Sequence, residues 1–396
     1  RIYLLPPADV VVDPRQEGCE YPFKGLCGAA VAYKLVEALC EVNGQEASDL
    51  DYLLENVAIA TVADVMDLTE ENRILVRQGL EMLERTSNLG LRSLIQCIGL
   101  EGKKIQAYHI GFILAPCLNA SGKLDTAKRA LALLRAKTER EADILAGDLK
   151  ALNESRRDMT DRVVDEAMAK VEQTDIRDDK VLVIYLPDCH ESLAGLVAGR
   201  VRENYYRPVF VLTDAEDGVK GSGRSIESYS MYEELTKCSD LLTKFGGHPM
   251  AAGLSLDKNN VEEFRRRLNE QCTLSEEELT EKVVIDMELP FSGITEHFIE
   301  ELAYLEPFGK GNTKPVFAAR GVTMQKVRII GKNKNVAKAI AVDSAGNRVE
   351  AICFRDVQEF ARQCEKNNGK MSITFYPGIN EFRGERTIQI TITHYR

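Results

Sequence analysis

The sequence predicts an α/β protein built from four successive parts, and three patterns along its 396 residues support this. Apolar residues recur every three or four positions in the first third of the chain, which is typical of amphipathic helices. A long and strongly charged helical pattern follows, and the residues after it alternate between strand and helix patterns. Short strand-like runs at close spacing fill the remainder, which favours a small β-barrel.

Changes in pattern and composition mark the boundaries between these parts. The charged helical pattern ends in the polar stretch 175–180, and the apolar run Val181–Tyr185 that follows is typical of a buried strand. Further along, we expect a helix near Tyr229–Lys244. The α-rich part, the long connecting helix, the α/β part and the barrel are predicted at 1–136, 137–175, 176–275 and 281–396.

Composition excludes several classes of protein. Hydrophobic residues at 44% and charged residues at 29% are ordinary for a globular chain and exclude disordered and fibrous proteins. No apolar run reaches the length of a membrane span, so we expect no membrane partner. Ten cysteines without a C-x-x-C pair fit a reducing cytoplasm, which predicts a cytoplasmic protein. The net charge of −11 disfavours nucleic-acid binding over the whole surface and leaves room for a local patch.

The clearest local patch lies in the predicted barrel. Between Pro307 and Val342 the sequence has eight basic residues and no acidic one. A barrel with such a stripe and with aromatic side chains suits sequence-tolerant binding of a single strand, whereas a solvated lysine-rich face is the alternative. The aromatic candidates are Phe308, Phe317, Phe354 and Tyr376, and the lysines expected to meet backbone phosphates are Lys332, Lys334 and Lys338.

Two glycine-rich segments of the α/β part predict an anion site. In 220–225, glycines let the backbone approach a ligand closely and the Arg224 guanidinium suits a phosphate, although a β-turn has the same composition. In 245–253, a histidine stands in a glycine loop and can donate to a phosphate or act as acid or base. The expected substrate contacts are Ser222, Gly223, Arg224, Ser225, Gly246 and Gly247, with His248 as a catalytic residue.

A possible metal ligand lies earlier in the chain. The apolar segment 59–68 ends at the carboxylates of Asp64 and Asp67. A carboxylate at the end of a buried segment suits a hard divalent cation. The alternative is a helix cap, because Asp67 or Thr69 could begin a helix near Glu70.

Two further polar sites are candidates for substrate binding. Asn119, Ser121 and Lys123 precede a predicted helix, whose first backbone N–H groups suit a phosphate, although an ordinary capped loop explains them equally well. His190 stands at a strand-to-helix turn, where the ligands of α/β units gather. We find no convincing Walker loop, dinucleotide fingerprint or Ser-His-Asp order, which disfavours those classes of enzyme.

Eight segments indicate a family resemblance when they are taken together, although each of them alone is too short to do so. They are 5–14, 60–64, 118–122, 190–195, 221–225, 246–248 with 251–253, 305–312 and 380–384. In this order they resemble the RecJ exonucleases of the DHH phosphoesterase family, and the resemblance covers nearly the whole chain.

The resemblance implies an architecture and an activity. The architecture is a DHH domain, a long helix, a DHH-associated domain and an OB-fold that binds nucleic acid. The implied activity, in DNA repair and recombination, is hydrolysis of single-stranded DNA from the 5′ end at a two-metal site holding Mn²⁺ or Mg²⁺. Asp64 would then be a metal ligand, while Ser222, Arg224 and His248 would hold the strand, with Asn119 and Lys123 nearby. The resemblance also implies a monomer, with a single-strand-binding protein and a helicase as possible partners.

The chain departs from the family pattern in two ways. No Asp-His-His triplet occurs, and the chain starts at Arg1, so we expect a fragment that lacks the earlier metal-binding motifs and is inactive alone. One carboxylate cannot satisfy two cations that each take about six oxygen ligands. In addition, Cys117 and Lys123 stand where many relatives have arginines, and a lysine lacks the bidentate fork.

Two other functions stay open on this evidence. One is a protein that binds single strands without cutting them. The other is a relative that hydrolyses oligoribonucleotides or cyclic dinucleotides, which the predicted barrel disfavours because so short a substrate needs no long binding track.

Overall fold

The computed structural model describes residues 7–124, 127–331, 333–366, 368–382 and 384–396. The chain divides into two compact units. The first comprises residues 1–87, 100–115 and 283–396, and the second comprises 88–99 and 116–282. No helix in the described ranges is both long and apolar enough to cross a membrane.

The first unit contains a helical part whose core forms around α1, α2 and α3. Buried apolar residues, among them Tyr33, Val57 and Leu75, join these helices. The helical elements here are α1 (Gly28–Val42), a 3₁₀ helix (Ala47–Leu53), α2 (Leu54–Ala63), α3 (Glu70–Glu84), α5 (Ala107–His109) and a π-helical turn (Ile110–Leu114).

The residues that precede the helices differ in whether they cap them. Asn88 and Thr138 accept a backbone hydrogen bond through their side chains and so cap helices of the second unit, whereas Thr69 precedes α3 of the first unit without accepting such a bond.

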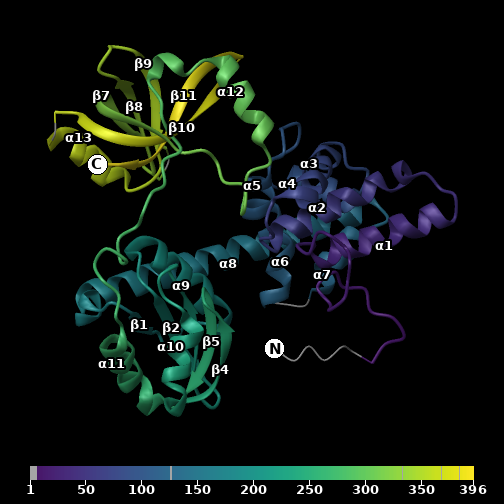
Figure 1. The fold of residues 1–396 in the computed structure, drawn as a ribbon, viewed down its shortest axis with the longest axis horizontal. Coiled ribbons are helices and arrows are strands. Elements are labelled where there is room, and N and C mark those ends of the chain that lie inside the picture. Colours follow the sequence, from purple (N-terminus) through teal and green to yellow (C-terminus); the bar gives the residue numbers. More distant parts are fainter. Residues whose placement is uncertain (1–6, 125–126, 332, 367, 383) are drawn as a thin grey trace. The chain divides into compact units, whose positions relative to one another are not determined.

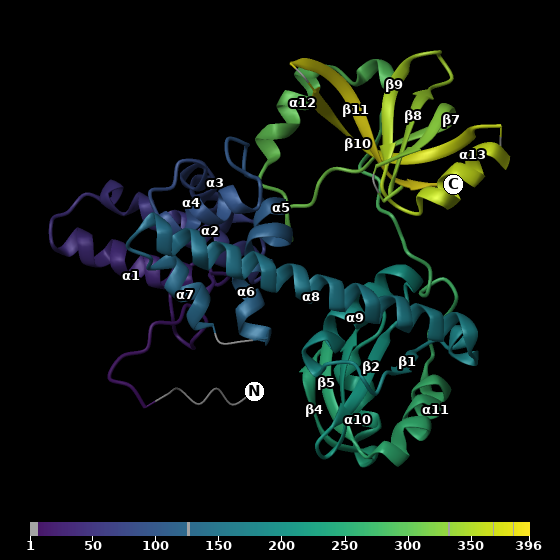
Figure 2. The ribbon, with the colours of Figure 1, turned by 180° about the vertical axis from the view of Figure 1, so that it is seen from behind.

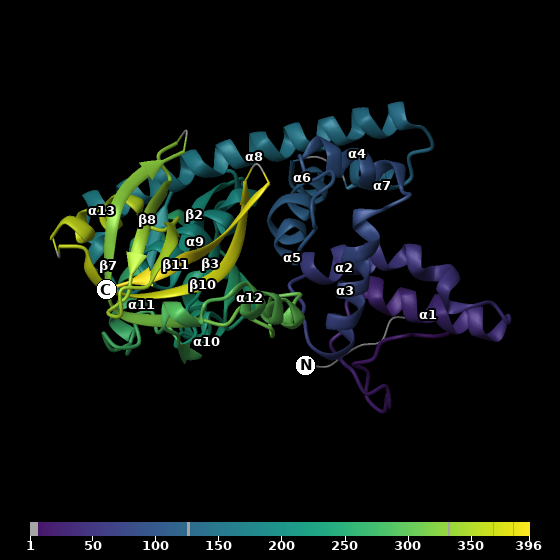
Figure 3. The same cartoon turned by 90° about the horizontal axis from the view of Figure 1, so that it is seen from above.

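The rest of the first unit is a closed barrel of five strands. The strands follow the order β10-β11-β9-β8-β7, and a further pairing of β7 with β10 closes the ring. Figure 3 shows β7, β8, β10 and β11 curving around this ring. Phe317, Phe360 and Phe375 fill its core. The elements are β6 (Met287–Glu288), α12 (Glu296–Leu302), β7 (Phe317–Ile330), β8 (Val336–Val342), β9 (Arg348–Cys353), α13 (Val357–Lys366), β10 (Lys370–Phe382) and β11 (Glu385–Tyr395).

The second unit is organised around the long helix α8 (Glu139–Gln173), which falls within the range predicted for a connecting helix. At a rise of 1.5 Å per residue this helix is about 52 Å long. It packs on α4 and α7 near its beginning and on α9 near its end (Figure 2). The helices that precede it are α4 (Leu89–Cys97), α6 (Ala115–Leu124) and α7 (Lys128–Leu134).

A five-stranded sheet in the order β1-β2-β3-β5-β4 completes the second unit. Its β1 and β2 are parallel, and the other neighbouring pairs are antiparallel. Helices α8 and α9 cover one face, while α10 and α11 cover the other (Figure 1). The elements are β1 (Leu182–Tyr185), α9 (Glu191–Tyr205), β2 (Val209–Ala215), β3 (Gly218–Arg224), α10 (Met231–Lys237), β4 (Leu242–His248), β5 (Ala251–Leu256) and α11 (Val261–Gln271).

Three local predictions about these elements are wrong. The glycine-rich segment 220–225 is not a turn, because its residues up to Arg224 lie in strand β3 and Ser225 follows that strand. The helix expected near Tyr229–Lys244 ends at Lys237, and a 3₁₀ turn (Ser239–Leu241) and the start of β4 take the end of that range. Asn119 and Lys123 lie within α6 and not in a loop before the next helix, α7.

Candidate nucleic-acid interface

The glycines of the second unit's sheet divide between its two faces. Side chains alternate along a strand, so residues two apart share a face. A Cβ on Gly223 would lie 2.4 Å from the Met231 sulfur, and a Cβ on Gly247 would lie 2.4 Å from the Ala251 carbonyl. These two glycines therefore satisfy close packing within the fold, and not the approach of a ligand that the sequence predicts for them.

The other face carries a strip almost without side chains. Ser222 on β3 pairs in register with Gly253 on β5, which pairs with Gly246 on β4. A Cβ on Gly246 would meet nothing within 4 Å, and one on Gly253 would meet only a carbonyl oxygen at 3.9 Å. Both glycines are exposed. We call Ser222, Gly253 and Gly246 the glycine strip; a polymer backbone can approach it closely.

Arg224 lies beside the glycine strip, two residues beyond Ser222 along β3. Its Nη1 donates to the Gly223 carbonyl at 2.8 Å, and its other terminal nitrogen lies against α9, where a Cβ on Gly195 would be 2.8 Å away. Burial, and to a lesser degree the nearby Arg202 guanidinium, lower the pKa of Arg224. Within the described ranges no carboxylate forms an ion pair with Arg224. A half-buried guanidinium without a described carboxylate partner suits an anionic ligand.

His248 lies on the same side of the strip as Arg224, because both residues pair with Ala251. The imidazole is exposed, and its Nδ1 accepts a hydrogen bond from the Met250 N–H at 3.3 Å. In the neutral ring Nε2 must then carry the proton, so His248 is a hydrogen-bond donor. The structure thus brings together Ser222, Arg224 and His248, as the sequence predicts.

Ser225 does not belong to this group. Its side chain is 1% exposed, and its hydroxyl donates to the Tyr229 carbonyl at 2.6 Å. Its backbone N–H also donates, to the Met250 carbonyl. The predicted substrate contact by Ser225 is therefore replaced by a structural role that holds the end of β3.

A cavity of about 450 Å³ opens beside the strip. It is lined by Lys220, Lys244 and Ser255, which sequence reasoning missed, and by Ser192 at the start of α9. His190 caps α9, since its Nδ1 accepts from the Ser192 N–H and lies 2.7 Å from the Ser192 hydroxyl. It also lines a larger hollow around Lys220 and Lys244.

The candidates on α6 are not joined to this interface by any described contact. Asn119 is exposed on the helix. The side chain of Lys123 lies outside the described residues. Their predicted role in substrate binding therefore stays a prediction.

Asp64 belongs to the first unit, where it ends helix α2. It is exposed, and the next residue, Val65, has a φ of 54°. Lys310, which is distant in the sequence, contacts the turn that follows Asp64. The Leu68 N–H donates to the Lys310 carbonyl at 2.7 Å, and Lys310 Nζ lies 3.0 Å from Asp67. Asp67 is thus an ion-pair partner of Lys310 and is not the cap of α3.

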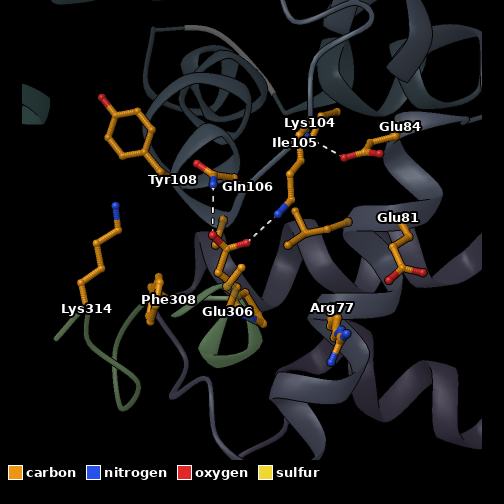
Figure 4. A pocket seen from close by; sticks show the side chains of 14 residues that line it. Arg77, Glu81, Glu84, Lys104, Ile105, Gln106, Tyr108, Glu306, Phe308 and Lys314 are labelled. Atoms are coloured by element: carbon orange, nitrogen blue, oxygen red, sulfur yellow. Dashed lines mark hydrogen bonds and ion pairs between the residues drawn. The ribbon is translucent and has the colours of Figure 1, made fainter. Parts of the chain in front are cut away.

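The segment that contains Lys310 also borders a cavity of about 200 Å³ in the first unit (Figure 4). Glu306 accepts from Lys104 Nζ at 2.9 Å and from Gln106 Nε2 at 3.3 Å. Arg73 donates to the Tyr304 carbonyl at 2.7 Å. These hydrogen bonds and the ion pair position the segment 304–312 against the helical part. Because Lys310 belongs to this segment, they also stabilise the turn after Asp64.

The described residues do not fit a two-metal site. No group of three or more histidine, cysteine, aspartate or glutamate side chains within these ranges is placed to hold a metal ion. Asp64 alone offers too few oxygens for even one hard cation. We therefore derive no step of catalysis through a metal.

The barrel lysines only partly match their prediction. Lys338 forms an ion pair with Glu350 on the adjacent strand at 2.9 Å, so part of its charge is compensated. Lys334 is exposed, and Lys332 lies outside the described residues. Lys314 lies over the ring of Tyr376, with 4.8 Å from Nζ to the ring centroid.

The aromatic side chains of the barrel differ in their exposure. Phe317 is 3% exposed and belongs to the core, so the expectation that it stacks a base is wrong. Phe354 is 57% exposed and is open to a base. The ring of Phe308 makes an edge contact with that of Tyr376.

Comparisons with known proteins agree with this geometry. Residues 178–274 match the DHHA1 domain, and residues 285–394 match the RecJ OB domain. The single-stranded-DNA-specific exonuclease RecJ of Bacillus subtilis is 36% identical over 395 residues, which span 98% of this chain and 49% of that protein. The RecJ of Salmonella typhimurium is 32% identical, with 98% and 70% covered. The crystal structure of RecJ with Mn²⁺ from Thermus thermophilus has a TM-score of 0.78 at 27% identity, covering 95% of this chain and 54% of that chain.

The matched domains and the closed barrel define a protein that combines a DHHA1 domain with an OB-fold. Within that class, the chain belongs to the RecJ family of single-stranded-DNA-specific exonucleases. It spans about half the length of the Bacillus subtilis relative.

Proposed function

We propose that this chain is the strand-holding part of a metal-dependent exonuclease that degrades single-stranded DNA from its 5′ end, in DNA repair and recombination. The observation that carries the proposal is Arg224, a half-buried guanidinium without a carboxylate partner in the described ranges, beside the glycine strip. Solved RecJ structures hold Mg²⁺ or Mn²⁺, which supports a divalent metal as the cofactor.

In this proposal each group has a distinct task. The glycine strip admits the sugar-phosphate backbone, because Gly246 and Gly253 offer no side chain to repel it. Arg224 and His248 bind the 5′-terminal phosphate through charge-assisted hydrogen bonds. The barrel offers a separate surface for single-stranded DNA, and Asp64 would contribute one metal ligand. Since the described acids do not complete a metal site, the chain alone should bind DNA without cutting it.

Binding and digestion assays on the same preparation test this proposal. Fluorescence anisotropy should detect binding of a 5′-phosphorylated oligodeoxynucleotide, and Mn²⁺ should not lead to its digestion by this chain. Efficient digestion would refute our account of the incomplete metal site. Absence of binding to any single strand would refute the proposed function.

The two alternatives predict different substrates. A protein that only binds single strands would stay inactive even in a longer RecJ polypeptide that carries Asp-His-His. A phosphodiesterase for dinucleotides would turn over a dinucleotide faster than a long DNA strand. The closed barrel favours the long strand. We further infer that the protein acts as a monomer, alongside a single-strand-binding protein and a helicase.

The barrel makes a separate prediction about salt. Replacing Lys334 and Lys338 together by alanine should flatten the dependence of log K on log salt by about 0.7 for each phosphate that the variant no longer neutralises. Lys338 should contribute less than Lys334, because Glu350 already pairs with it. Titrations at several salt concentrations measure the slope, and a double variant with the wild-type slope would return both lysines to an ordinary solvated surface.

A further inference from the structure

The glycine strip runs across β3, β5 and β4, and on the side away from Arg224 it is followed by a second row of polar side chains. Lys220 on β3 pairs in register with Ser255 on β5, and Ser255 pairs with Lys244 on β4. These residues lie two positions beyond Ser222, Gly253 and Gly246 along their strands, so they share the face of the strip. All three line the cavity of about 450 Å³.

We propose that Lys220, Ser255 and Lys244 form a second phosphate subsite, which takes an internal phosphodiester of a single strand whose 5′ end lies at Arg224. This inference deepens the proposed function and rests on it. Arg224 and Lys220 are four residues apart on one strand, which corresponds to about 13 Å. A strand that begins at Arg224 and crosses the glycine strip along the direction of β3 therefore reaches the row that contains the two lysines.

The charges in the cavity are not equally available. Lys220 Nζ lies 2.8 Å from Glu191, and this pairing raises the pKa of Lys220 and lowers that of Glu191. Lys244 is exposed and makes no hydrogen bond or ion pair with any described residue. Lys244 is thus the principal phosphate ligand, while Lys220 keeps the Glu191 carboxylate from acting as an uncompensated negative charge.

Other acids stand near the cavity and limit where the strand can pass. Asp214, Glu216 and Asp217 line the larger hollow that also includes Lys220 and Lys244. Asp214 is paired with Lys258 at 3.1 Å. A polyanion is repelled from the β2–β3 turn by these carboxylates, so its path stays over the strip and over Lys244 on β4.

A scan of neutral linkages tests the subsite. The probe is a 5′-phosphorylated oligodeoxynucleotide in which one phosphodiester at a time is replaced by an uncharged methylphosphonate. With the wild-type chain, one internal linkage should weaken binding more than its neighbours. With Lys244→Ala that particular effect should disappear, and the slope of log K against log salt should flatten by about 0.7. Lys244→Arg should restore both effects.

Lys237→Ala is the matched control. Lys237 is an exposed lysine on α10, which covers the opposite face of the same sheet, and it pairs with Glu234 at 2.6 Å, so its replacement removes one positive charge without touching the strip. Its neutral-linkage scan and salt slope should equal those of the wild type. Because Lys244 has no described partner, Lys244→Ala should unfold at the wild-type temperature.

Two outcomes would overturn the subsite while leaving the proposed function intact. In the first, binding depends on Arg224, but replacing any internal phosphodiester by a methylphosphonate leaves the affinity of the wild-type chain unchanged. In the second, the linkage effect persists unchanged in Lys244→Ala. A wild-type chain that binds no oligodeoxynucleotide would instead remove the proposed function, and this inference with it.

Discussion

Replacing Arg224 by alanine should weaken binding of a 5′-phosphorylated single strand by roughly 10- to 100-fold. The reason is the loss of charge-assisted hydrogen bonds to a phosphate, which are worth about 1.5–3 kcal/mol. Arg224 forms no ion pair with a described carboxylate, so no acid is left unpaired when the guanidinium is removed. Anisotropy titrations with phosphorylated and unphosphorylated strands of the same sequence measure the effect.

The unphosphorylated strand is the internal control of that experiment. It should lose much less affinity, because it has no terminal phosphate for Arg224 to bind. Arg224→Lys should give an intermediate loss, since lysine keeps the charge and lacks the planar fork. Equal losses for both strands would show that Arg224 supports general affinity and does not recognise the terminal phosphate.

Periodicity in the sequence was sufficient to predict the main elements. The long helix α8 and the five-stranded barrel follow from helical and strand-like runs that are local in the sequence. The pattern failed at 220–225, where glycine and serine suggested a turn. Tertiary packing explains the failure, because Gly223 has Phe210 and Met231 as close neighbours and is required within a strand.

A wrong prediction of secondary structure also concealed the role proposed for Lys244. A helical reading of 229–244 placed this lysine at the end of a helix, whereas it lies on edge strand β4 across from Ser255. Only the register of the sheet shows that Lys244 and Lys220 flank one cavity. Strand register depends on long-range pairing, which a single sequence does not reveal.

Charge compensation was also invisible in the sequence. The window around Lys338 has no acidic residue, yet Glu350 on β9 lies 2.9 Å from it. Asp67 and Lys310 are likewise far apart in the sequence and 3.0 Å apart in the fold. Arg224 differs from these cations, since burial lowers its pKa and no described carboxylate pairs with it. This contrast supports Arg224 as the proposed ligand of the terminal phosphate.

A matched pair of glycine substitutions should separate the two roles that glycine has in this sheet. Gly223→Ala places a methyl group 2.4 Å from the Met231 sulfur and 2.7 Å from the Phe210 ring, and we expect it to destabilise the fold. Overpacking of this kind costs about 1–3 kcal/mol, which urea denaturation would detect.

Gly246→Ala should have the opposite profile. Its methyl group meets nothing within 4 Å, so the free energy of unfolding should stay within about 0.5 kcal/mol of the wild type. The same methyl group projects into the glycine strip, where it should hinder the approach of a sugar-phosphate backbone and weaken binding several-fold. A Gly246→Ala chain with both normal stability and normal affinity would mean that DNA does not pass over the strip. Because β4 is an edge strand, we expect it to accept the added methyl group. The normal stability of such a variant would exclude misfolding as an explanation of its affinity.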